Sequence, residues 1–510
     1  MQTTQEKKLY GELKVVKLPD EERRTRVCLI YTGGTIGMIP KERGLEPATL
    51  EELLAVVPSL GKKEGIELGL VAFHKPIDST FVSMQHWLAM ASAIEEHYDS
   101  FDGFVLLHGT DTMAFTTSAL SFLLNNLAKP VVVTGSQLPI YQQRGDGLMN
   151  LIHATMIAGY RATGVQKTCE VTLCFMDRLL RGNRAVKVSA EKWQGFDSPN
   201  FPWLGTIGEH IRIRQDLLLP PPVDVDRSPF YADKKFAGEI KVIYVTPGLT
   251  PAHLERDLNT ADLDGALLVT YGAGNAPTSD EFLQPLRDAI DGTKRQKSIQ
   301  ILNITQCLDG TVEMGKYMAS APLLDVGVAS GLDLTFEAAF AKMYWALAKY
   351  SGDEIRSGLQ ISQRGEQSEN LFDLVYAPEQ KRKSEAQTTV KPPVKYLHGK
   401  YRRDLVKTAS LRVSGLDLVA DESAEQPPRF RVFVGHQGAG PDTSTREPYF
   451  AGEFGEDDIL ADGSMGTDVT RVVQTVVESG PVYVALVCIN GRLSCKSITL
   501  TIFTDVAKSS

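Results

Sequence analysis

The sequence predicts two α/β domains followed by an all-β module of the sandwich type. From Arg26 onward, short β-branched runs alternate with longer segments whose apolar residues recur at helical spacing, which is typical of a parallel sheet with helices on both faces. The proline run at 220–222 interrupts this alternation, and beyond Ala377 only short alternating strands remain. A chain of 510 residues has room for two or three domains.

The larger α/β domain is expected over residues 26–216, after an N-terminal extension at 1–25. Continuous apolar runs predict strands at 27–31, 104–108, 130–135 and 171–176. Helical spacing of apolar residues predicts helices at 112–127 and 147–160. Such sheets bind ligands at the carboxyl ends of their strands, so the residues after these strands are candidates for a site.

A second, smaller α/β domain is expected over 239–376, joined to the first by a linker at 217–238. Buried strands that end in turn residues are predicted within 241–248, 265–277 and 298–310, and a helix at 336–350. A polar, charged and proline-containing linker follows at 377–396. The all-β module at 397–510 has predicted strands at 409–420, 429–436, 467–478, 481–489 and 494–503.

Composition and charge exclude several classes of function. The chain has 54 Lys and Arg against 63 Asp and Glu, a formal charge of −9, and so lacks the basic surface that nucleic acid requires. The N-terminus is charged where a signal peptide is apolar, and no apolar run approaches the roughly 20 residues of a membrane-spanning helix. The six cysteines form no Cys-x-x-Cys pair and show no zinc-ligand spacing. We expect a soluble, cytoplasmic protein with reduced cysteines, without nucleic acid, membrane or metal partners.

Two of the predicted strands end in the same kind of turn. One runs into Thr-Gly-Gly-Thr, which ends at Thr35, and another into His-Gly-Thr-Asp, which contains Thr110 and Asp111. Glycine allows a sharp turn, so each threonine hydroxyl is expected at the mouth of the sheet beside free backbone N–H groups, the minimum required for acyl transfer. Singly, these are common turn sequences, and Asp111 or Thr112 would serve simply as a helix N-cap. Together they predict one shared site.

A threonine hydroxyl is a weak nucleophile and needs a neighbour that accepts its proton. Asp111 follows Thr110 directly, but a carboxylate is a feeble base near neutral pH, and a buried lysine is better matched. Lys187, after the strand at 171–176, is a candidate, although a solvated surface lysine is the ordinary interpretation. The chain lacks a Gly-x-Ser-x-Gly elbow, a His-Glu-x-x-His helix, a P-loop and a complete dinucleotide loop, so no cofactor is implied.

The long motifs closely resemble those of the bacterial-type L-asparaginases, most like the cytoplasmic type I branch. They are YTGGTIGM, LHGTDTMAFTTSALSFLL, VVVTGSQLPIYQQRGDGLMNLIHATMIA, RGNRAVK, TYGAGNAP and TQCLDGTVEMGKY, in the family's order between about Val27 and Leu347. The resemblance implies hydrolysis of L-asparagine to L-aspartate and ammonia through an acyl-enzyme, without metal or cofactor. It implies Thr35 as nucleophile on a mobile loop, and Thr110 with Lys187 as its base as the pair that activates water. Asp111 would grip the substrate's α-amino group.

The same resemblance assigns substrate binding to Asp78, Ser79 and Thr80, with Ser79 donating to the α-carboxylate. From the residues alone, this triplet is a loop that enters a helix near Val82, with Ser79 or Thr80 as its cap. The segment after Thr35, IGMIPKERGLEPATLEE, lacks the tyrosine that many relatives place near the nucleophile.

Other functions stay open at this stage. An ammonia-supplying subunit of a tRNA-dependent amidotransferase would carry a further domain before Thr-Gly-Gly-Thr, where this chain has only about thirty residues. A non-catalytic amino-acid sensor or scaffold that has lost the chemistry is another possibility. The presence of both threonines, the aspartate and the lysine argues against it, because such a protein would not need them. A lysophospholipase activity, known among longer relatives, has no motif of its own here. The resemblance also implies a homodimer or homotetramer, and weaker activity on glutamine.

Overall fold

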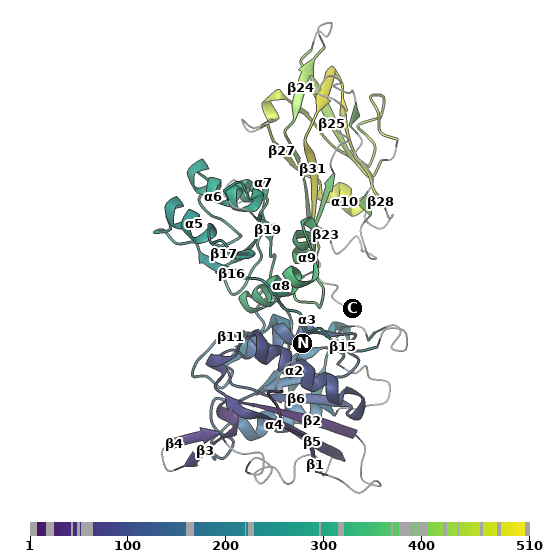
Figure 1. Cartoon of the computed structure of the whole chain (residues 1–510). Helices are drawn as coiled ribbons and strands as arrows, with labels where there is room; N and C mark the ends of the chain where they lie inside the picture. The colour runs from purple at the N-terminus through teal and green to yellow at the C-terminus, as the bar shows by residue number, and fades with distance from the viewer. Residues whose placement is uncertain are drawn as a thin grey trace, which may run out of the picture. The chain divides into compact units, whose positions relative to one another are not determined.

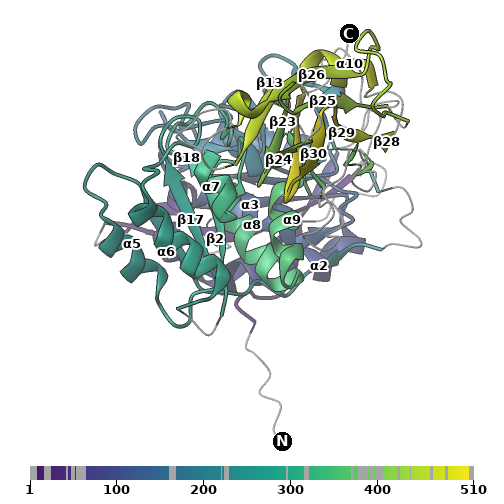
Figure 2. The same cartoon turned by 90° about the horizontal axis from the view of Figure 1, so that it is seen from above.

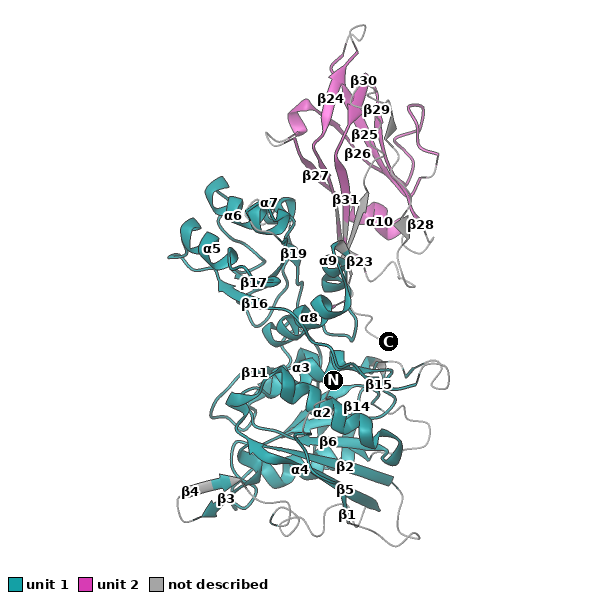
Figure 3. Ribbon diagram, in the orientation of Figure 1, with its two compact units in different colours: residues 1–367 teal, residues 368–510 magenta. Residues whose placement is uncertain are grey.

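The computed structural model describes most of the chain, in two compact units. The described residues are 8–16, 25–41, 44–47, 52, 65–159, 168–219, 221–222, 229–294, 297–314, 321–368, 371–376, 389–390, 395–396, 406–421, 426–436, 438–459, 463–476 and 481–504. Unit 1 comprises residues 1–367 and unit 2 residues 368–510 (Figure 3). Unit 1 contains a larger and a smaller α/β lobe, and unit 2 is rich in strands (Figure 1).

A nine-stranded sheet forms the centre of the larger lobe. Its five parallel strands lie in the order β5 (Ile66–Ile77), β2 (Thr25–Gly33), β6 (Gly103–Leu107), β8 (Val131–Thr134) and β9 (Val171–Phe175). The chain first adds β5 on one side of β2 and then continues with β6 on the other side. The direction of winding therefore reverses between β2 and β6, which in open α/β sheets is where ligands bind.

Antiparallel strands extend the sheet at both edges. β1 (Lys14–Val16) pairs with β5, and β10 (Arg178–Arg181), β13 (Gly205–Ile207) and β14 (Ile211–Ile213) continue beyond β9. Short pairs stand apart from it: β3 (Met38–Lys41) with β4 (Gly44–Pro47), β7 (Leu124–Asn125) with β15 (Tyr231–Ala232), and β11 (Val186–Lys187) with β12 (Phe196–Asp197). The predicted extension at 1–25 thus contributes β1, and the predicted linker at 217–238 contributes β15.

Helices cover both faces of the parallel strands. In β2, Cys28 and Ile30 belong to one hydrophobic core and Val27 and Leu29 to another, so the strand is buried on both sides. Buried residues of α2 (Met84–His97) and α3 (Met113–Leu123) complete the first core, and those of α4 (Gly147–Ala158) the second. Burial on both faces explains the continuous apolar runs in the sequence.

The smaller lobe is a second parallel sheet, β16 (Ile240–Tyr244), β17 (Gly265–Thr270), β18 (Gln300–Thr305) and β19 (Ala329–Ser330). Its helices are α5 (Pro251–Leu258), α6 (Asp280–Asp291), α7 (Ala321–Val326), α8 (Phe336–Lys349) and α9 (Asp353–Gln360), with α5 and α6 side by side in Figures 1 and 2. Helix α8 packs on α3 of the larger lobe, where Phe115 meets Phe336 and Phe340 edge to face. These contacts join the lobes.

The described residues of unit 2 form a β-sandwich that also carries the helix α10 (Thr470–Val476). One four-stranded sheet has the order β20 (Leu371–Tyr376), β31 (Ser497–Thr504), β23 (Val406–Ser414) and β27 (Met465–Asp468). The other has the order β21 (Thr389–Val390), β29 (Val484–Cys488), β25 (Arg429–Val434) and β26 (Phe450–Gly455). Shorter pairs are β22 (Lys395–Tyr396) with β28 (Pro481–Val482) and β24 (Asp417–Ala420) with β30 (Gly491–Ser494). Leu411 and Leu500 of one sheet share a core with Val432 and Leu486 of the other. Antiparallel strands around a common core confirm the predicted all-β architecture.

Two expectations for this region differ from the structure. The strand predicted at 467–478 is wrong over α10 (Thr470–Val476), because Val472, Val473 and Val476 are buried together at helical spacing. The division between the units falls after Gln367, earlier than the predicted linker at 377–396, because β20 pairs with β31 of unit 2. Residues 377–388 of that linker lie outside the described residues.

Candidate active site

Three segments of unit 1 meet at the carboxyl ends of β2 and β6. Gly34 has φ of 86°, and a Cβ on it would stand 2.4 Å from the backbone nitrogen of Gly109. A Cβ on Gly109 would stand 2.5 Å from Ser79 Oγ. Only glycines allow so close an approach. Thr35 and Thr110 each follow one of these glycines, so the two threonine turns predicted from the sequence pack together, with Ser79 beside them.

The second threonine turn is joined to Lys187. Lys187, on β11, donates from Nζ to Thr110 Oγ1 at 2.9 Å and to Asp111 Oδ1 at 2.7 Å. Thr110 is 8% exposed, whereas the side chains of Lys187 and Asp111 are 21% and 57% exposed. The hydroxyl is therefore held by the lysine amine in a buried position, while the carboxylate beside it faces solvent. The structure brings these three residues together as the sequence suggested, and their chemical roles remain a prediction.

Thr35 opens a 3₁₀ turn, Thr35–Gly37, that continues into β3. Thr35 is half-buried, and Ile36 and Gly37 are buried. The hydroxyl of Tyr31, on β2, donates to the carbonyl of Gly37 at 3.4 Å, and burial raises the pKa of this phenol. The strand before the turn is thus tied to the turn itself. The tyrosine stays protonated and serves as a donor.

The segment Asp78–Thr80 forms a turn of its own beside Gly109. The carboxylate of Asp78 accepts hydrogen bonds from the backbone nitrogen and the hydroxyl of Thr80, at 3.0 and 2.9 Å. Thr112 donates from Oγ1 to the carbonyl oxygen of Ser79 at 2.7 Å, which links this turn to the segment after Asp111. The expectation that Ser79 or Thr80 caps the next helix is wrong, because α2 has Ser83 as its N-cap.

Sequence reasoning gave no role to His108, which is completely buried beside the second turn. Its Nδ1 lies 2.7 Å from the carbonyl oxygen of Gly109, which can only accept, so Nδ1 carries the proton. Nε2 then accepts from Thr116, whose hydroxyl in turn accepts from the indole nitrogen of Trp87. Burial lowers the pKa of His108 to about 4, so the ring is neutral. This relay fixes the peptide that precedes Thr110.

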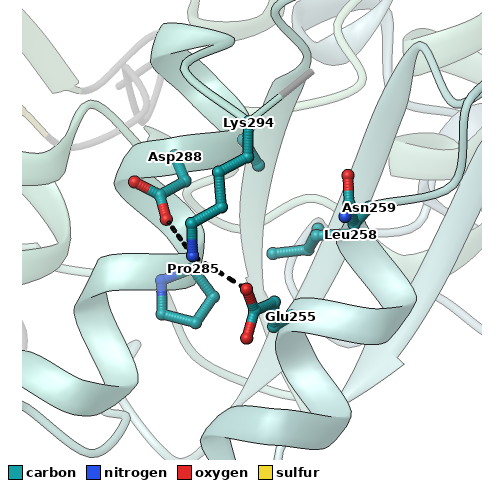
Figure 4. Close-up of a pocket in the computed structure, with 7 residues that line it drawn as sticks. Glu255, Leu258, Asn259, Pro285, Asp288 and Lys294 are labelled. Carbon is teal, nitrogen blue, oxygen red and sulfur yellow. Dashed lines mark hydrogen bonds and ion pairs between the residues drawn. The ribbon is translucent and has the colours of Figure 1, made fainter.

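A hollow on the smaller lobe contains none of these groups. It lies between α5 and α6, where Lys294 donates to Glu255 and pairs with Asp288, at 2.8 and 2.9 Å (Figure 4). The lysine lines the hollow and, through Glu255 and Asp288, ties the two helices together. Among the described residues, no cluster of three histidines, cysteines or acids could hold a metal ion. No helix in that part of the chain is long and apolar enough to cross a membrane.

The models for two protein domains match unit 1. The asparaginase N-terminal domain matches residues 26–219, and the glutaminase/asparaginase C-terminal domain matches residues 239–357. The chain belongs to the asparaginase family. This confirms the resemblance and the two-domain α/β fold that the motifs implied. Unit 2 lies outside both matches.

Individual asparaginases match over the same region. L-asparaginase 1 of Escherichia coli K12 is 38% identical over 347 residues, 68% of this chain and 98% of that protein. The structure of L-asparaginase I from Vibrio cholerae superimposes with a TM-score of 0.61 at 36% identity, and covers 68% of this chain and 99% of its own. The mouse 60 kDa lysophospholipase is 35% identical, but the match spans only 59% of its length.

Proposed function

We propose that this asparaginase hydrolyses L-asparagine to L-aspartate and ammonia through a threonyl ester. The observation that carries the proposal is the packing of the Thr35 and Thr110 turns at the reversal point of the sheet, with Lys187 bound to Thr110 and Asp111. The high identity to L-asparaginase 1 and to L-asparaginase I supports asparagine as the substrate.

In this proposal, Thr35 Oγ attacks the side-chain amide carbon of asparagine and loses its proton. The proton that left Thr35 is delivered to the amide nitrogen as the C–N bond breaks, and ammonia leaves the threonyl ester. Water attacks the ester carbon next, and Thr110 passes the proton of that water to Lys187, whose Nζ lies 2.9 Å from its hydroxyl. As the ester C–O bond breaks, this proton passes on to the Thr35 oxygen, which restores its hydroxyl and releases aspartate.

We assign substrate binding to the groups around the two threonines. Asp111, 57% exposed, presents its carboxylate to the α-amino group of asparagine. Ser79 would donate to the α-carboxylate, held in place by Gly109 and by the Thr112 hydroxyl on its carbonyl. Asp78 and Thr80 fix the shape of that turn through their mutual hydrogen bonds. Each contact fits an amino acid with both of its charged groups free.

Ammonia release from asparagine tests the proposal. Thr35→Ala, Thr110→Val and Lys187→Met should each lose roughly 10²- to 10⁴-fold in kcat while the protein stays folded. Thr206→Val, at an exposed position on strand β13, is the matched control and should keep wild-type activity. Asparagine binding without ammonia release by wild type would instead indicate a sensor, and release from glutamine alone an ammonia-supplying subunit. Either outcome would reject asparagine hydrolysis.

We further propose a cytoplasmic homodimer or homotetramer. All six cysteines are free and four are buried, which supports a reducing compartment. Phe81, next to the Asp78–Thr80 turn, is 75% exposed, and Leu148 and Met149 on α4 are 40% and 49% exposed, so large apolar side chains are left for a second subunit to cover. Light scattering of the full chain would give the mass, and a monomer at micromolar concentration would reject the assembly.

A further inference from the structure

A loop at the end of unit 1 holds the segment that leads into Lys187. The loop is residues 361–367, between α9 and unit 2, and we call it the 361–367 loop. The carbonyl oxygen of Gly365 accepts from Arg184 Nε at 2.8 Å and from Arg181 Nη1 at 3.4 Å. The carbonyl oxygen of Arg364 accepts from Asn183 Nδ2 at 2.9 Å. Two consecutive carbonyls thus bind three side chains of one short segment.

That segment, 181–184, leads directly into β11 and Lys187. It is the end of β10 and a 3₁₀ turn, Gly182–Arg184, and α3 holds it from the other side, where Thr117 donates to the carbonyl of Gly182 at 2.7 Å. Arg184 also pairs with Asp333 of the smaller lobe at 2.8 Å, with side chains 2% and 10% exposed. Only two residues separate Arg184 from Lys187, which pairs on β11 with Phe196 of β12, so the segment anchors the end of the strand that carries the lysine.

The 361–367 loop is itself anchored by a buried ion pair. Lys342 of α8 lies 2.7 Å from Glu366, and both side chains are completely buried. Lys342 also donates to the carbonyl of Ile361 and to Gln367 Oε1, while Glu366 accepts from the backbone nitrogens of Gln363 and Arg364. With both charges hydrogen-bonded to several partners, the pair ties the loop to α8.

We propose that the 361–367 loop is a positioning element for Lys187. The buried pair fixes the loop on α8, the loop carbonyls fix the 181–184 segment, and that segment presents Lys187 to Thr110 and Asp111. The loop touches neither substrate nor reacting atoms and acts through the lysine alone. The consequence for catalysis rests on the function proposed above, whereas the placement of Lys187 does not.

Gly365→Ala in the full chain tests this. Gly365 has φ of +70°, and a Cβ there would lie 2.4 Å from Arg181 Nη1, so the substitution strains the loop and displaces the arginine. Gly352→Ala is the matched control, because Gly352 also has a positive φ, +55°, but no atom lies within 4 Å of its Cβ position. Both variants bear the backbone strain, and only the first disturbs the contact with 181–184.

The first readout is the acylation rate of Lys187 by an amine-reactive ester, followed by mass spectrometry. We expect Lys187 to react about threefold or more faster in Gly365→Ala than in wild type or Gly352→Ala, with exposed Lys192 of each protein as internal reference. Unchanged labelling of Lys187 would overturn the proposal whatever the activity. If wild type releases no ammonia but the labelling changes as expected, the proposed function fails and the positioning role stands.

The second readout separates kcat from KM for asparagine. Loss of the lysine's orientation should lower kcat about tenfold or more and leave KM within about threefold, because the Asp78–Thr80 turn is untouched. The folded fraction, from thermal unfolding, corrects kcat for any loss of native protein. If Gly365→Ala does not fold, Asn183→Ala removes one donor to the Arg364 carbonyl and should give a smaller change of the same kind. If Gly352→Ala lowered kcat as much as Gly365→Ala, backbone strain alone would explain the effect, and the proposal would be overturned.

Discussion

Gly109→Ala would push apart the three segments that build the site, and its effect can be worked from their contacts. The added Cβ would lie 2.5 Å from Ser79 Oγ and 2.7 Å from Ser79 Cβ, where ordinary contact begins at 3.4 Å. Gly109 does not have a positive φ, so alanine fits its backbone conformation and the whole cost is steric. The Asp78–Thr80 turn and the Thr110 turn must therefore separate by about 1 Å, the scale of misplacement that costs roughly 100-fold in rate.

We expect kcat/KM for asparagine to fall about 100-fold, equivalent to about 2.7 kcal/mol of transition-state stabilisation. The free energy of unfolding should fall by only about 1–3 kcal/mol, as for other overpacked sites. Gly248→Ala, where no atom lies within 4 Å of the added Cβ, is the control and should match wild type in ammonia release. A folded Gly109→Ala protein with kcat/KM within about threefold of wild type would refute the reasoning, because the contact would then carry no catalytic geometry.

Three further predictions concern buried ionisable groups. Burial lowers the pKa of His108 to about 4, so between pH 6.5 and 4 this imidazole is protonated in the unfolded chain but not in the folded protein. The free energy of unfolding should therefore fall on acidification by up to about 1.4 kcal/mol per pH unit. In urea unfolding, the free energy of unfolding of His108→Gln should fall less steeply with pH than that of wild type. The same slope in both proteins would contradict the prediction. Burial raises the pKa of Glu337 to about 7, so the folded state loses stability as pH rises from about 4.5 to 7. Glu337→Gln should therefore be more stable than wild type at pH 8 by about 1–3 kcal/mol, and equal at pH 4, in the same urea series. Lys342→Met leaves the Glu366 carboxylate buried without its cation and should cost about 3–5 kcal/mol, while addition of Glu366→Gln should restore most of it in calorimetry.

The parallel core could be predicted because its strands are buried on both faces. β2, β6, β8 and β9 are continuous apolar runs in the sequence, and their predicted positions are confirmed to within a few residues. The helix α10 could not be predicted, because a valine-rich segment fits both a strand and a helix. It is decided by Asp468, whose carboxylate accepts from the Thr470 nitrogen, and by contact with β23. Neither interaction is visible in local spacing.

The site was predictable only in part from its residues. The turns at Thr35 and Thr110 follow from strands that end in glycine and threonine, whereas Lys187 reaches Thr110 across 77 residues of chain, by way of β10 and the 181–184 segment. From local sequence it was one lysine among many, and the family resemblance singled it out. The role of His108 depends on Thr116 and Trp87, which come from two other elements. In the sequence, the position of His108 directly before Gly109 was the one feature that could have indicated this role.

The chain passes from unit 1 to unit 2 immediately after the 361–367 loop, and this has a thermodynamic consequence. Any molecule that binds unit 2 and shifts the conformational equilibrium of this loop shifts, by the same free energy, the equilibrium between ordered and displaced Lys187. Because displacement of Lys187 is expected to lower kcat and leave KM nearly unchanged, such a molecule would change the rate of the reaction more than the affinity for asparagine. Unit 2 is thus attached at a point where the binding of an effector could change the rate of the reaction, even though the proposed chemistry uses residues of unit 1 alone.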